Sequence, residues 1–475
     1  MEEIMKNDDD YFDSTEFHDL LSEYEQAVAS NSPVFLDADE LTDIADYYQM
    51  NGQDDAAERA IRLALSLSPG AIGPLSYRIH SALYRDDIEQ AKQFYGQIVE
   101  TDEPDYVYLN AEIMLAENRA EEAHQFLLKQ YELIDNDERQ DYMIDVASIF
   151  SDYGQDELAM KWMKMAKPED SPDFKELMAR TLFGLGKYKD SERLFNELID
   201  TNPFSKHYWN ALASAQFMNE DYANAIQSSE FAIAIDPNDA DGLLSKANGL
   251  YNLGNYEEAQ KYYQRYSEQE PDDELAMVHQ AACLINMGMN DEALQLLHHA
   301  LEQADADSPY LGDIYQELAF ALSETGQIDD ALDTLDKTLS LDCDHVQMDI
   351  IRGHILLAND RPIEAEKCFQ KAIRTSETPA QTLLRIIVSV YDNSYFESAY
   401  NMFHKYFEMA GDDCTDGHAY MALCCYEMKK YDEFLDHLLK ATRLNPQECS
   451  LVLRHLFPEE IAPKDYYDYI KEKLK

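Results

Sequence analysis

Residues 209–237, WNALASAQFMNEDYANAIQSSEFAIAIDP, align without a gap with residues 243–271, LLSKANGLYNLGNYEEAQKYYQRYSEQEP. At a spacing of 34 residues the two stretches share two small residues, a tyrosine and a closing proline, namely Ala213 and Ala247, Ala225 and Ala259, Tyr222 and Tyr256, and Pro237 and Pro271. Self-similarity at a period of about 20 to 50 residues is typical of stacked structural units, each too small to bury its own apolar face. The period therefore predicts repeats, each made of a helix, a tight turn and a second helix.

The alanine that follows the turn recurs along almost the whole chain. Ten of twelve equivalent positions hold alanine, and the full set is Ala57, Ala91, Ala123, Ala159, Ser191, Ala225, Ala259, Ala293, Ala331, Ala365, Ala399 and Phe434. Twelve residues earlier, a second column is small at ten of twelve positions, and its members are Ala45, Ile79, Ala111, Ala147, Ala179, Ala213, Ala247, Ala281, Ala319, Gly353, Ile387 and Ala422. Small residues let two antiparallel helices approach closely, and alanine also has the highest helix propensity. Two columns in phase predict twelve helix pairs over residues 37–448.

Glycine and proline fall at the predicted ends of the helices. Six glycines stand five residues before the first of these columns, where the first helix must end in a left-handed residue, and they are Gly52, Gly154, Gly186, Gly254, Gly288 and Gly326. Prolines such as Pro237 and Pro271 fall where the second helix must stop. Each unit therefore has its turn and its boundary at a predicted position.

The unit at residues 209–237 resembles the tetratricopeptide repeat family. Its Trp, Leu, Ala, Tyr, Ala, Ala and Pro stand at the offsets of the family's characteristic positions, as Trp209, Leu212, Ala213, Tyr222, Ala225, Ala232 and Pro237. The resemblance covers most of the chain and implies an all-α fold, a right-handed solenoid of stacked helix-turn-helix units with helical caps at both ends. It also implies that peptide ligands lie in the concave groove formed by the first helix of every unit.

The two ends depart from the period and are expected to cap the stack. Residues 1–36 are interpreted as an acidic mobile tail followed by a capping helix, in which Asp13 and Glu16 form a capping box and the apolar stripe is Phe17, Leu20, Leu21, Tyr24 and Val28. Residues 449–475 are expected to form capping helices interrupted at Pro458 and Pro463, the last with Tyr466, Tyr467, Ile470 and Leu474 on its apolar side. The alanine-to-alanine step lengthens to 36 before Ala159 and to 38 before Ala331, which predicts longer junctions near residues 135–141 and 303–309.

The charge of the chain restricts its partners. There are 94 acidic and 38 basic side chains among 475 residues, giving a net charge of −56. Nucleic acid and anionic membranes are poor partners for such a chain, because both attract basic surfaces. Two explanations remain open: the charge keeps a long solenoid soluble, or it attracts basic segments of partner proteins. The sequence has no signal peptide and no transmembrane segment, so a cytoplasmic, bacterial protein is expected.

No motif indicates catalysis, a cofactor or a metal. The sequence lacks a phosphate-binding glycine loop, a nucleophile elbow and an HExxH pair. The seven cysteines show neither zinc spacing nor a disulfide framework, and Cys283, Cys424 and Cys425 are interpreted as buried thiols. The His298-His299 doublet is assigned to surface or packing. His80 and His354 stand beside the small first-helix column, where packing is favoured over ligand contact.

Candidate binding residues come from the second, fifth, ninth and twelfth positions of each first helix, which share one side of the helix. The proposed peptide-binding residues are Tyr108, Arg180, Phe183, Asn210, Phe217, Asn248, Tyr251, Leu275, Ile285 and Tyr391. The asparagines would hold an extended backbone, and the aromatic residues would supply rigid contacts. A clamp for a terminal carboxylate is disfavoured because Arg180 stands nearly alone.

The same positions change from acidic and polar near the N-terminus to apolar near the C-terminus. The apolar members are Leu275, Val278, Ile285, Ile350, Leu357, Leu384, Val388, Tyr391, Leu423 and Tyr426. They form either part of a peptide channel or a stretch of buried core. The leading hypothesis is a non-catalytic scaffold or adaptor that binds basic or apolar protein segments. The alternatives are self-assembly through the apolar C-terminal groove or cap, and a regulatory subunit of an enzyme.

Overall fold

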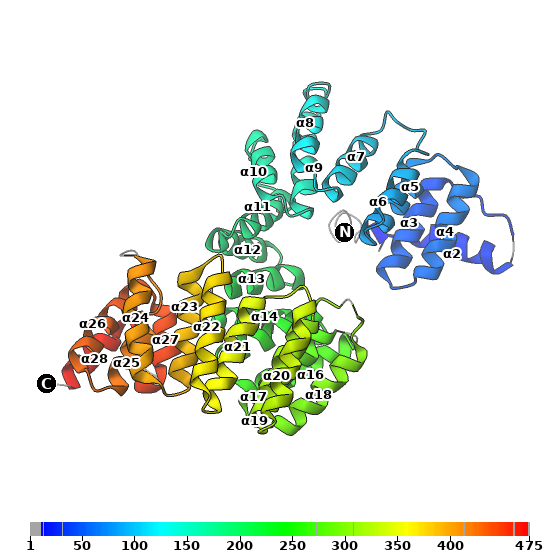
Figure 1. Ribbon diagram of the computed structural model, residues 1–475. Coiled ribbons are helices and arrows are strands. Elements are labelled where there is room, and N and C mark those ends of the chain that lie inside the picture. Colours follow the sequence, from blue (N-terminus) through cyan, green and yellow to red (C-terminus); the bar gives the residue numbers. More distant parts are fainter. Residues whose placement is uncertain are drawn as a thin grey trace. The chain divides into compact units, whose positions relative to one another are not determined.

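The computed structural model describes residues 11–12, 14–30, 32–168, 170–271, 273–306, 308–411, 414–458 and 461–473. Within these ranges every regular element is a helix (Figure 1). The chain divides into two compact units, Met1–Thr201 and Asn202–Lys475, which we describe separately. No helix among the described residues combines the length and the apolar character needed to cross a membrane.

The first unit holds an N-terminal helix and five helix pairs. The helices are α2 Thr15–Ser30, α3 Ala38–Met50, α4 Asp54–Leu67, α5 Ile72–Tyr84, α6 Ile88–Tyr95, α7 Pro104–Ala116, α8 Ala120–Tyr131, α9 Arg139–Asp152, α10 Asp156–Met165, α11 Pro172–Gly184 and α12 Tyr188–Thr201. Odd-numbered helices from α3 onward are the first members of their pairs. Asp37 begins the first pair through a capping box with Glu40, at the predicted boundary.

The second unit holds seven pairs and the C-terminal helices. The pairs comprise α13 Lys206–Met218, α14 Tyr222–Ile235, α15 Ala240–Asn252, α16 Tyr256–Gln269, α17 Glu274–Asn286, α18 Asn290–Gln303, α19 Leu311–Glu324, α20 Ile328–Lys337, α21 His345–Ala358, α22 Pro362–Thr375, α23 Pro379–Asp392, α24 Phe396–Ala410, α25 His418–Glu427 and α26 Tyr431–Leu444. The remaining elements are η1 Thr338–Ser340, α27 Pro446–Leu453, η2 Arg454–Leu456, η3 Pro463–Asp465 and α28 Tyr466–Lys473. All twelve predicted helix pairs are therefore present.

The two columns of small residues form the contacts within the pairs. Every one of their 24 positions is buried, including the large exceptions Ile79, Ile387 and Phe434. In the pair that holds Phe434, the second column has the small residue Ala422, and both are buried. The alanine periodicity thus follows from the close approach of two helix backbones.

The turn within each pair has one left-handed residue, at the same register position in all twelve. The six predicted glycines have φ between 64° and 80°. In the other six pairs the position is taken by a residue with a side chain, namely Asp86, Asn118, Glu220, Asp360, Ser394 and Lys429, with φ between 54° and 65°. The turn geometry is common to every pair, although only half of them use the residue that adopts it without strain.

The Ser14 Oγ accepts from the Phe17 amide at 3.1 Å near the start of α2. Asp13, on which the predicted capping box depends, and the tail 1–10 lie outside the described residues. The ends differ from the expectations in two details. Val28 is 48% exposed, so it does not belong to the buried stripe of α2. The first C-terminal helix begins at Pro446 instead of Cys449, because the Asn445 side chain caps it through the Glu448 amide at 2.9 Å.

The lengthened junctions lie where the period predicted them. Residues 132–138 connect α8 to α9, and residues 304–310 connect α18 to α19. The column step shortens to 32 residues before Ala123 and before Ser191, and there the second helices α6 and α10 have only 8 and 10 residues. Insertions are therefore taken up between pairs, whereas deletions shorten the second helix.

The second unit returns to itself after seven pairs. The Gln447 side-chain amide donates to the backbone oxygen of Asn219 at 3.1 Å, so α27 contacts the turn between α13 and α14. The C-terminal helices also bury apolar residues in this unit, and Phe457 stacks on Tyr466 with 3.7 Å between ring centroids. Tyr467 and Ile470 are half-buried beside this cluster, and Leu474 lies outside the described residues.

Candidate binding groove

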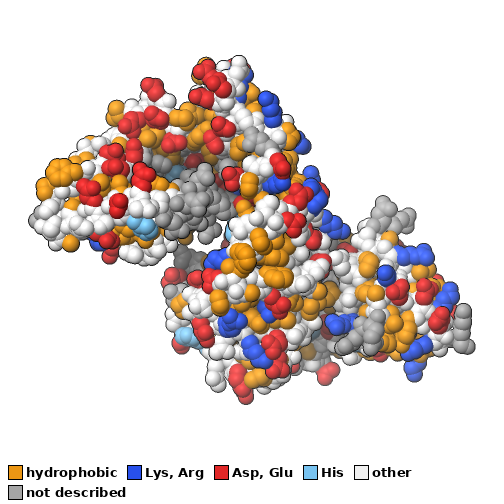
Figure 2. All heavy atoms as spheres, turned by 180° about the vertical axis from the view of Figure 1, so that it is seen from behind, with side chains coloured by type: hydrophobic (Ala, Val, Ile, Leu, Met, Phe, Trp, Pro, Cys, Tyr) orange, Lys and Arg blue, Asp and Glu red, His pale blue; other side chains and the backbone are white. Residues whose placement is uncertain are grey.

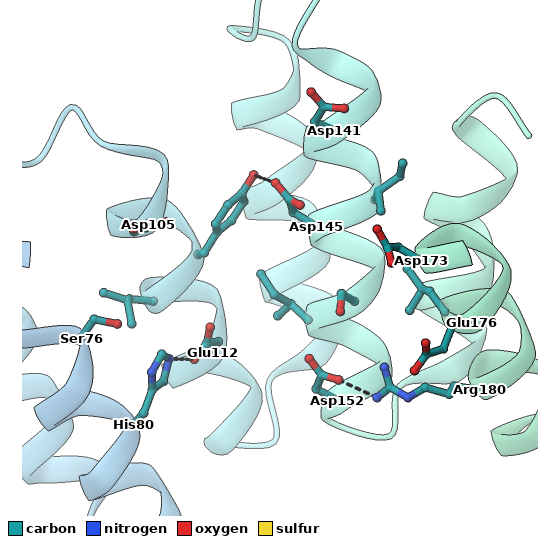
Figure 3. A pocket seen from close by; sticks show the side chains of 16 residues that line it. Ser76, His80, Asp105, Glu112, Asp141, Asp145, Asp152, Asp173, Glu176 and Arg180 are labelled. Atoms are coloured by element: carbon teal, nitrogen blue, oxygen red, sulfur yellow. Dashed lines mark hydrogen bonds and ion pairs between the residues drawn. The ribbon is translucent and has the colours of Figure 1, made fainter. Parts of the chain in front are cut away.

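First helices of the first unit line a cavity of about 660 Å³, which we call the acidic groove. Its walls are α5, α7, α9 and α11, and Figure 3 shows their side chains converging on it. Eleven lining residues occupy the second, fifth or ninth register position, and they are Ser76, His80, Asp105, Tyr108, Glu112, Asp141, Ile144, Ser148, Asp173, Glu176 and Arg180. The concave face predicted from the period thus exists as a cavity in this unit.

Carboxylates dominate the acidic groove. Seven line it, namely Asp105, Glu112, Asp141, Asp145, Asp152, Asp173 and Glu176. Against them stand only two lining side chains that can carry positive charge, Arg180 and His80. Figure 2 shows acidic side chains exposed on the face that it presents, with basic side chains also present there.

The chain's own side chains engage several of these carboxylates. Arg180 forms an ion pair with Asp152 at 2.7 Å, and the side chains of both residues are about one quarter or less exposed. The His80 ring nitrogen Nε2 lies 2.7 Å from Glu112 Oε2. These contacts lie at the two sides of the groove (Figure 3) and show that its carboxylates bind cationic groups.

Between them, the Tyr108 hydroxyl donates to Asp145 at 3.0 Å. Burial raises the pKa of the Asp145 carboxyl, and the charges of Asp141 and Asp105 raise it further, although the Tyr108 hydrogen bond opposes this. Burial likewise raises the pKa of Asp105, with a further contribution from Glu112. The carboxylates of α7 and α9 therefore repel one another across the groove.

His80 has a raised pKa for a different reason. Burial would lower it, but the charge and hydrogen bond of Glu112, together with the charge of Asp46, outweigh that effect. The protonated ring is the form that the groove stabilises. His354, the other histidine beside the small column, lies 3.1 Å from the Ser389 hydroxyl, and burial lowers its pKa.

The proposed peptide-binding residues do not all meet at one place. Tyr108 and Arg180 line the acidic groove. Leu275, Ile285 and Tyr391 are half-buried in the second unit. Four other apolar positions from the same register, Val278, Ile350, Leu357 and Leu423, are buried there.

The two asparagines are engaged within the chain. Asn210 donates to Asp239 at 2.6 Å, and its own Oδ1 is buried without a hydrogen-bond partner among the described residues. Asn248 Oδ1 accepts from the Tyr263 hydroxyl at 2.6 Å. Each amide therefore connects its first helix to a neighbouring element.

Four proposed aromatic residues share one contact across the turn of their pair. Each packs on the aromatic residue five positions later, at centroid distances of 5.1 to 5.4 Å, in the pairs Phe183–Tyr188, Phe217–Tyr222, Tyr251–Tyr256 and Tyr391–Phe396. Edge-to-face and tilted contacts of this kind stabilise aromatic pairs. These residues therefore help to hold the turn.

Sequence reasoning missed the contribution of α9. Asp141, Ile144 and Ser148 follow from the same register but were not among the proposed residues. Asp145 and Asp152 stand one position beyond the fifth and twelfth, so a strict register passes over them. Their acidic character next to predicted groove positions was the available signal.

Stacked helix pairs with a concave face define an α-solenoid, and three family models identify its repeats. All three are described as tetratricopeptide repeat models, and they match residues 177–240, 216–282 and 272–344. Residues 177–344 of the chain therefore hold tetratricopeptide repeats. Repeats of this family support a general role as a protein-interaction scaffold.

Solved structures with a similar arrangement include three repeat proteins. A tetratricopeptide repeat protein from Parabacteroides merdae is 16% identical, with 53% of this chain and 98% of that chain covered and a TM-score of 0.45. Yeast Tom70 is 14% identical, with 92% and 95% covered and a TM-score of 0.44. The Cut9–Hcn1 hetero-tetramer of the APC/C is 14% identical, with 94% and 98% covered and a TM-score of 0.34. At these values the likenesses carry no information on partners, and no curated protein matches the sequence.

Proposed function

We propose that this protein is a non-catalytic adaptor that holds a basic segment of a partner protein in the acidic groove. The observation that supports this is the excess of carboxylates around a concave cavity, seven against one arginine and one histidine. A Lys- or Arg-rich segment supplies the missing charge. The general scaffold role of the repeats is thereby given a location and a class of partner.

The groove favours such a segment on physical grounds. Ion pairs in a partly buried cleft are stronger than on an open surface, because water screens them less. The surrounding negative field also speeds the encounter with a basic partner. The contacts of Arg180 and His80 demonstrate this type of interaction within the chain itself.

A segment with several separate cations fits better than a single metal ion. The carboxylates come from three helices, α7, α9 and α11. Among the described residues, no group of three or more His, Cys, Asp or Glu side chains is placed to hold one metal ion. The charges are therefore distributed for a ligand that extends along the groove.

The test compares the wild type with the double variant Asp141→Asn/Asp173→Asn. Fluorescence anisotropy measures the affinity of each protein for a fluorescein-labelled peptide that contains lysines. Both residues lie in the first turn of a helix at the groove. The matched control is Asp55→Asn/Glu121→Gln, which removes the same charge from exposed first-turn positions of α4 and α8 outside the groove. We expect the groove variant to bind at least about tenfold more weakly, as the loss of two ion pairs predicts, and the control to bind nearly as well as the wild type.

Equal loss in the two variants would mean that net charge alone attracts the peptide, and the groove assignment would be wrong. Circular dichroism of both variants checks that they remain helical. The first-turn positions matter for this comparison, because a carboxylate near a helix N-terminus stabilises the helix by about 0.3 to 1 kcal/mol. The control variant loses the same kind of first-turn carboxylate, so both variants should lose similar helix stability. A difference between them in peptide affinity then reports on the groove.

A further inference from the structure

Helix α27 is fixed to the end of the stack in the second unit. It packs on α25 and α26, and its residues Cys449 and Leu453 are fully buried. The Glu448 carboxylate accepts from the backbone amides of Gly417 at 2.6 Å and Ala419 at 3.1 Å, at the start of α25. Because of these contacts, α27 moves together with the last helix pair.

One side chain of this helix reaches the first pair of the same unit. The Gln447 amide donates to the backbone oxygen of Asn219 at 3.1 Å, across 228 residues of sequence. Asn219 is the C-cap of α13, and Glu220 follows it as the left-handed residue of the turn. The pairs of a solenoid contact mainly their neighbours, so stacking alone does not require this contact. It joins the two ends of the second unit, and the seven pairs close into a ring.

Electrostatic repulsion opposes this closure. Glu448 and Glu220 are the residues that follow the two hydrogen-bonded ones, and their like charges interact. The pKa of Glu448 is raised by burial and further by the charges of Asp416 and Glu220, although its bonds to two backbone amides lower it. A single hydrogen bond that is exposed to water contributes little net stability. The closed ring is therefore held by a weak attraction acting against a repulsion.

The concave face of the second unit is partly shielded from water. Glu317 and Tyr420 stand at the register position that Asp145 occupies in the acidic groove. Tyr251 is at one of the predicted groove positions, and all three of these second-unit side chains are half-buried. Burial raises the pKa of Glu317 to about 6 and those of Tyr251 and Tyr420 to about 12. A wider ring would hydrate these groups.

We infer that the contact between Gln447 and Asn219 is a latch on the second unit. When the contact is made, the unit is a closed ring with a narrow concave face. When it is released, the last pair moves away from α13 and the face opens, because small rotations between successive pairs add up along the stack. The inference is independent of the proposed function, since the acidic groove lies in the first unit.

The test compares Gln447→Lys, Gln447→Ala and Gln447→Glu in the full-length protein by hydrogen–deuterium exchange of the amides of residues 219–221. A lysine brings an attractive charge to Glu220, whereas a glutamate adds to the repulsion. We expect exchange at least about twofold slower than in the wild type for the lysine variant, and at least about twofold faster for the other two, with the glutamate variant fastest. The matched control is Gln381→Glu, at an exposed position in the first turn of α23, which should leave this exchange unchanged.

Helix stability alone predicts the opposite order of the charged variants. Gln447 lies in the first turn of α27, where a glutamate stabilises the helix and a lysine destabilises it. If this side chain mattered only for its own helix, Gln447→Glu would show the slowest exchange in residues 446–453 and no change in residues 219–221. That result would overturn the latch, and so would equal exchange of residues 219–221 in all variants.

The opening of the face is measured by the reaction of histidines with diethyl pyrocarbonate, followed by mass spectrometry. His279 and His354 are half-buried on α17 and α21, at register positions that line the acidic groove in the first unit, and His299 is exposed on α18 as an internal reference. Relative to His299, we expect both to react at least about twofold faster in Gln447→Glu and more slowly in Gln447→Lys. Unchanged relative rates in both variants would show that this contact does not control the width of the face.

Discussion

Gly353 lies directly under the ring of Phe369, in the contact between the helices of the tenth pair. A Cβ atom at Gly353 would lie 2.3 Å from Phe369 Cε1 and 2.7 Å from Cδ1 and Cζ. The other pairs have a larger residue at this register position, most often alanine. The backbone of Gly353 is helical, so this position does not need glycine for a left-handed φ. The need for glycine comes from the Phe369 ring, which leaves no room for a Cβ atom.

Replacing this glycine should destabilise the second unit. We expect Gly353→Ala to lower the free energy of unfolding by about 1 to 3 kcal/mol through overpacking, although alanine is the better helix former. Adding Phe369→Leu should recover part of this loss, giving a positive coupling in a double-mutant cycle measured by urea unfolding. Gly96→Ala, where the nearest atoms are 3.5 Å or farther, is the control with little expected cost. Additive losses would show that the ring is not the obstacle.

Lys429 adopts a left-handed conformation, with φ of 59°, at a position that other pairs fill with glycine. A side chain in this region costs about 1 to 2 kcal/mol, part of which glycine returns through the entropy of the unfolded chain. Lys429→Gly should therefore raise the melting temperature, and the gain in the free energy of unfolding should be at most about 1 kcal/mol. Lys367→Gly, at an exposed position inside α22, should lower stability by about 1 kcal/mol. A loss of stability in Lys429→Gly would contradict the shared turn geometry.

The ion pair between His80 and Glu112 should make stability depend on pH. The pKa of His80 is raised in the folded protein, so its contribution is fully present below the ordinary value of 6.5 and is lost as the pH rises through the raised value. The stability difference between wild type and His80→Gln should thus be larger near pH 6 than near pH 9. In a Glu112→Gln background this difference should no longer vary with pH in the same way. If the stability difference between wild type and His80→Gln instead grows toward alkaline pH, the His80–Glu112 ion pair does not stabilise the fold as stated.

Binding of the lysine peptide to the acidic groove should weaken as the pH falls. Asp145 and Asp105 have raised pKa values, so they become neutral at a higher pH than ordinary aspartates and then no longer attract a cation. We expect the loss of affinity below neutral pH to be smaller in Asp145→Asn than in the wild type. His80→Gln separates the contribution of His80, whose protonation also adds positive charge as the pH falls. Affinity that is independent of pH would exclude these carboxylates from the contact.

Periodicity alone predicted the helix pairs, because the contact between two helix backbones leaves a direct trace in the sequence. Ala225 and Ala259 belong to this contact, and each is fully buried. The left-handed turns could be predicted as well as the helices where a glycine marks them, as at Gly254. At Glu220 and Lys429 the same left-handed turn exists without that mark, because the surrounding pair imposes the conformation.

The candidate groove was predictable in its location on the first helices, but only partly in its residues. Arg180 and Tyr108 were proposed and line it, whereas Asp145 and Asp152 were not. Phe217 and Tyr251 were chosen as ligand contacts from their register, and each packs on an aromatic residue across its own turn. A register specifies the side of a helix, but it does not specify which neighbour a long side chain reaches.

By itself, the sequence determined the repeat, its twelve helix pairs and the excess of acidic charge, because short-range spacing and composition encode these directly. Tertiary structure decided which carboxylates share one cavity and which of them the chain neutralises, as with Arg180 at Asp152. It also decided that Gln447 reaches Asn219 across seven pairs. Such contacts depend on small rotations between successive pairs, and these accumulate along the stack without leaving a local pattern in the sequence.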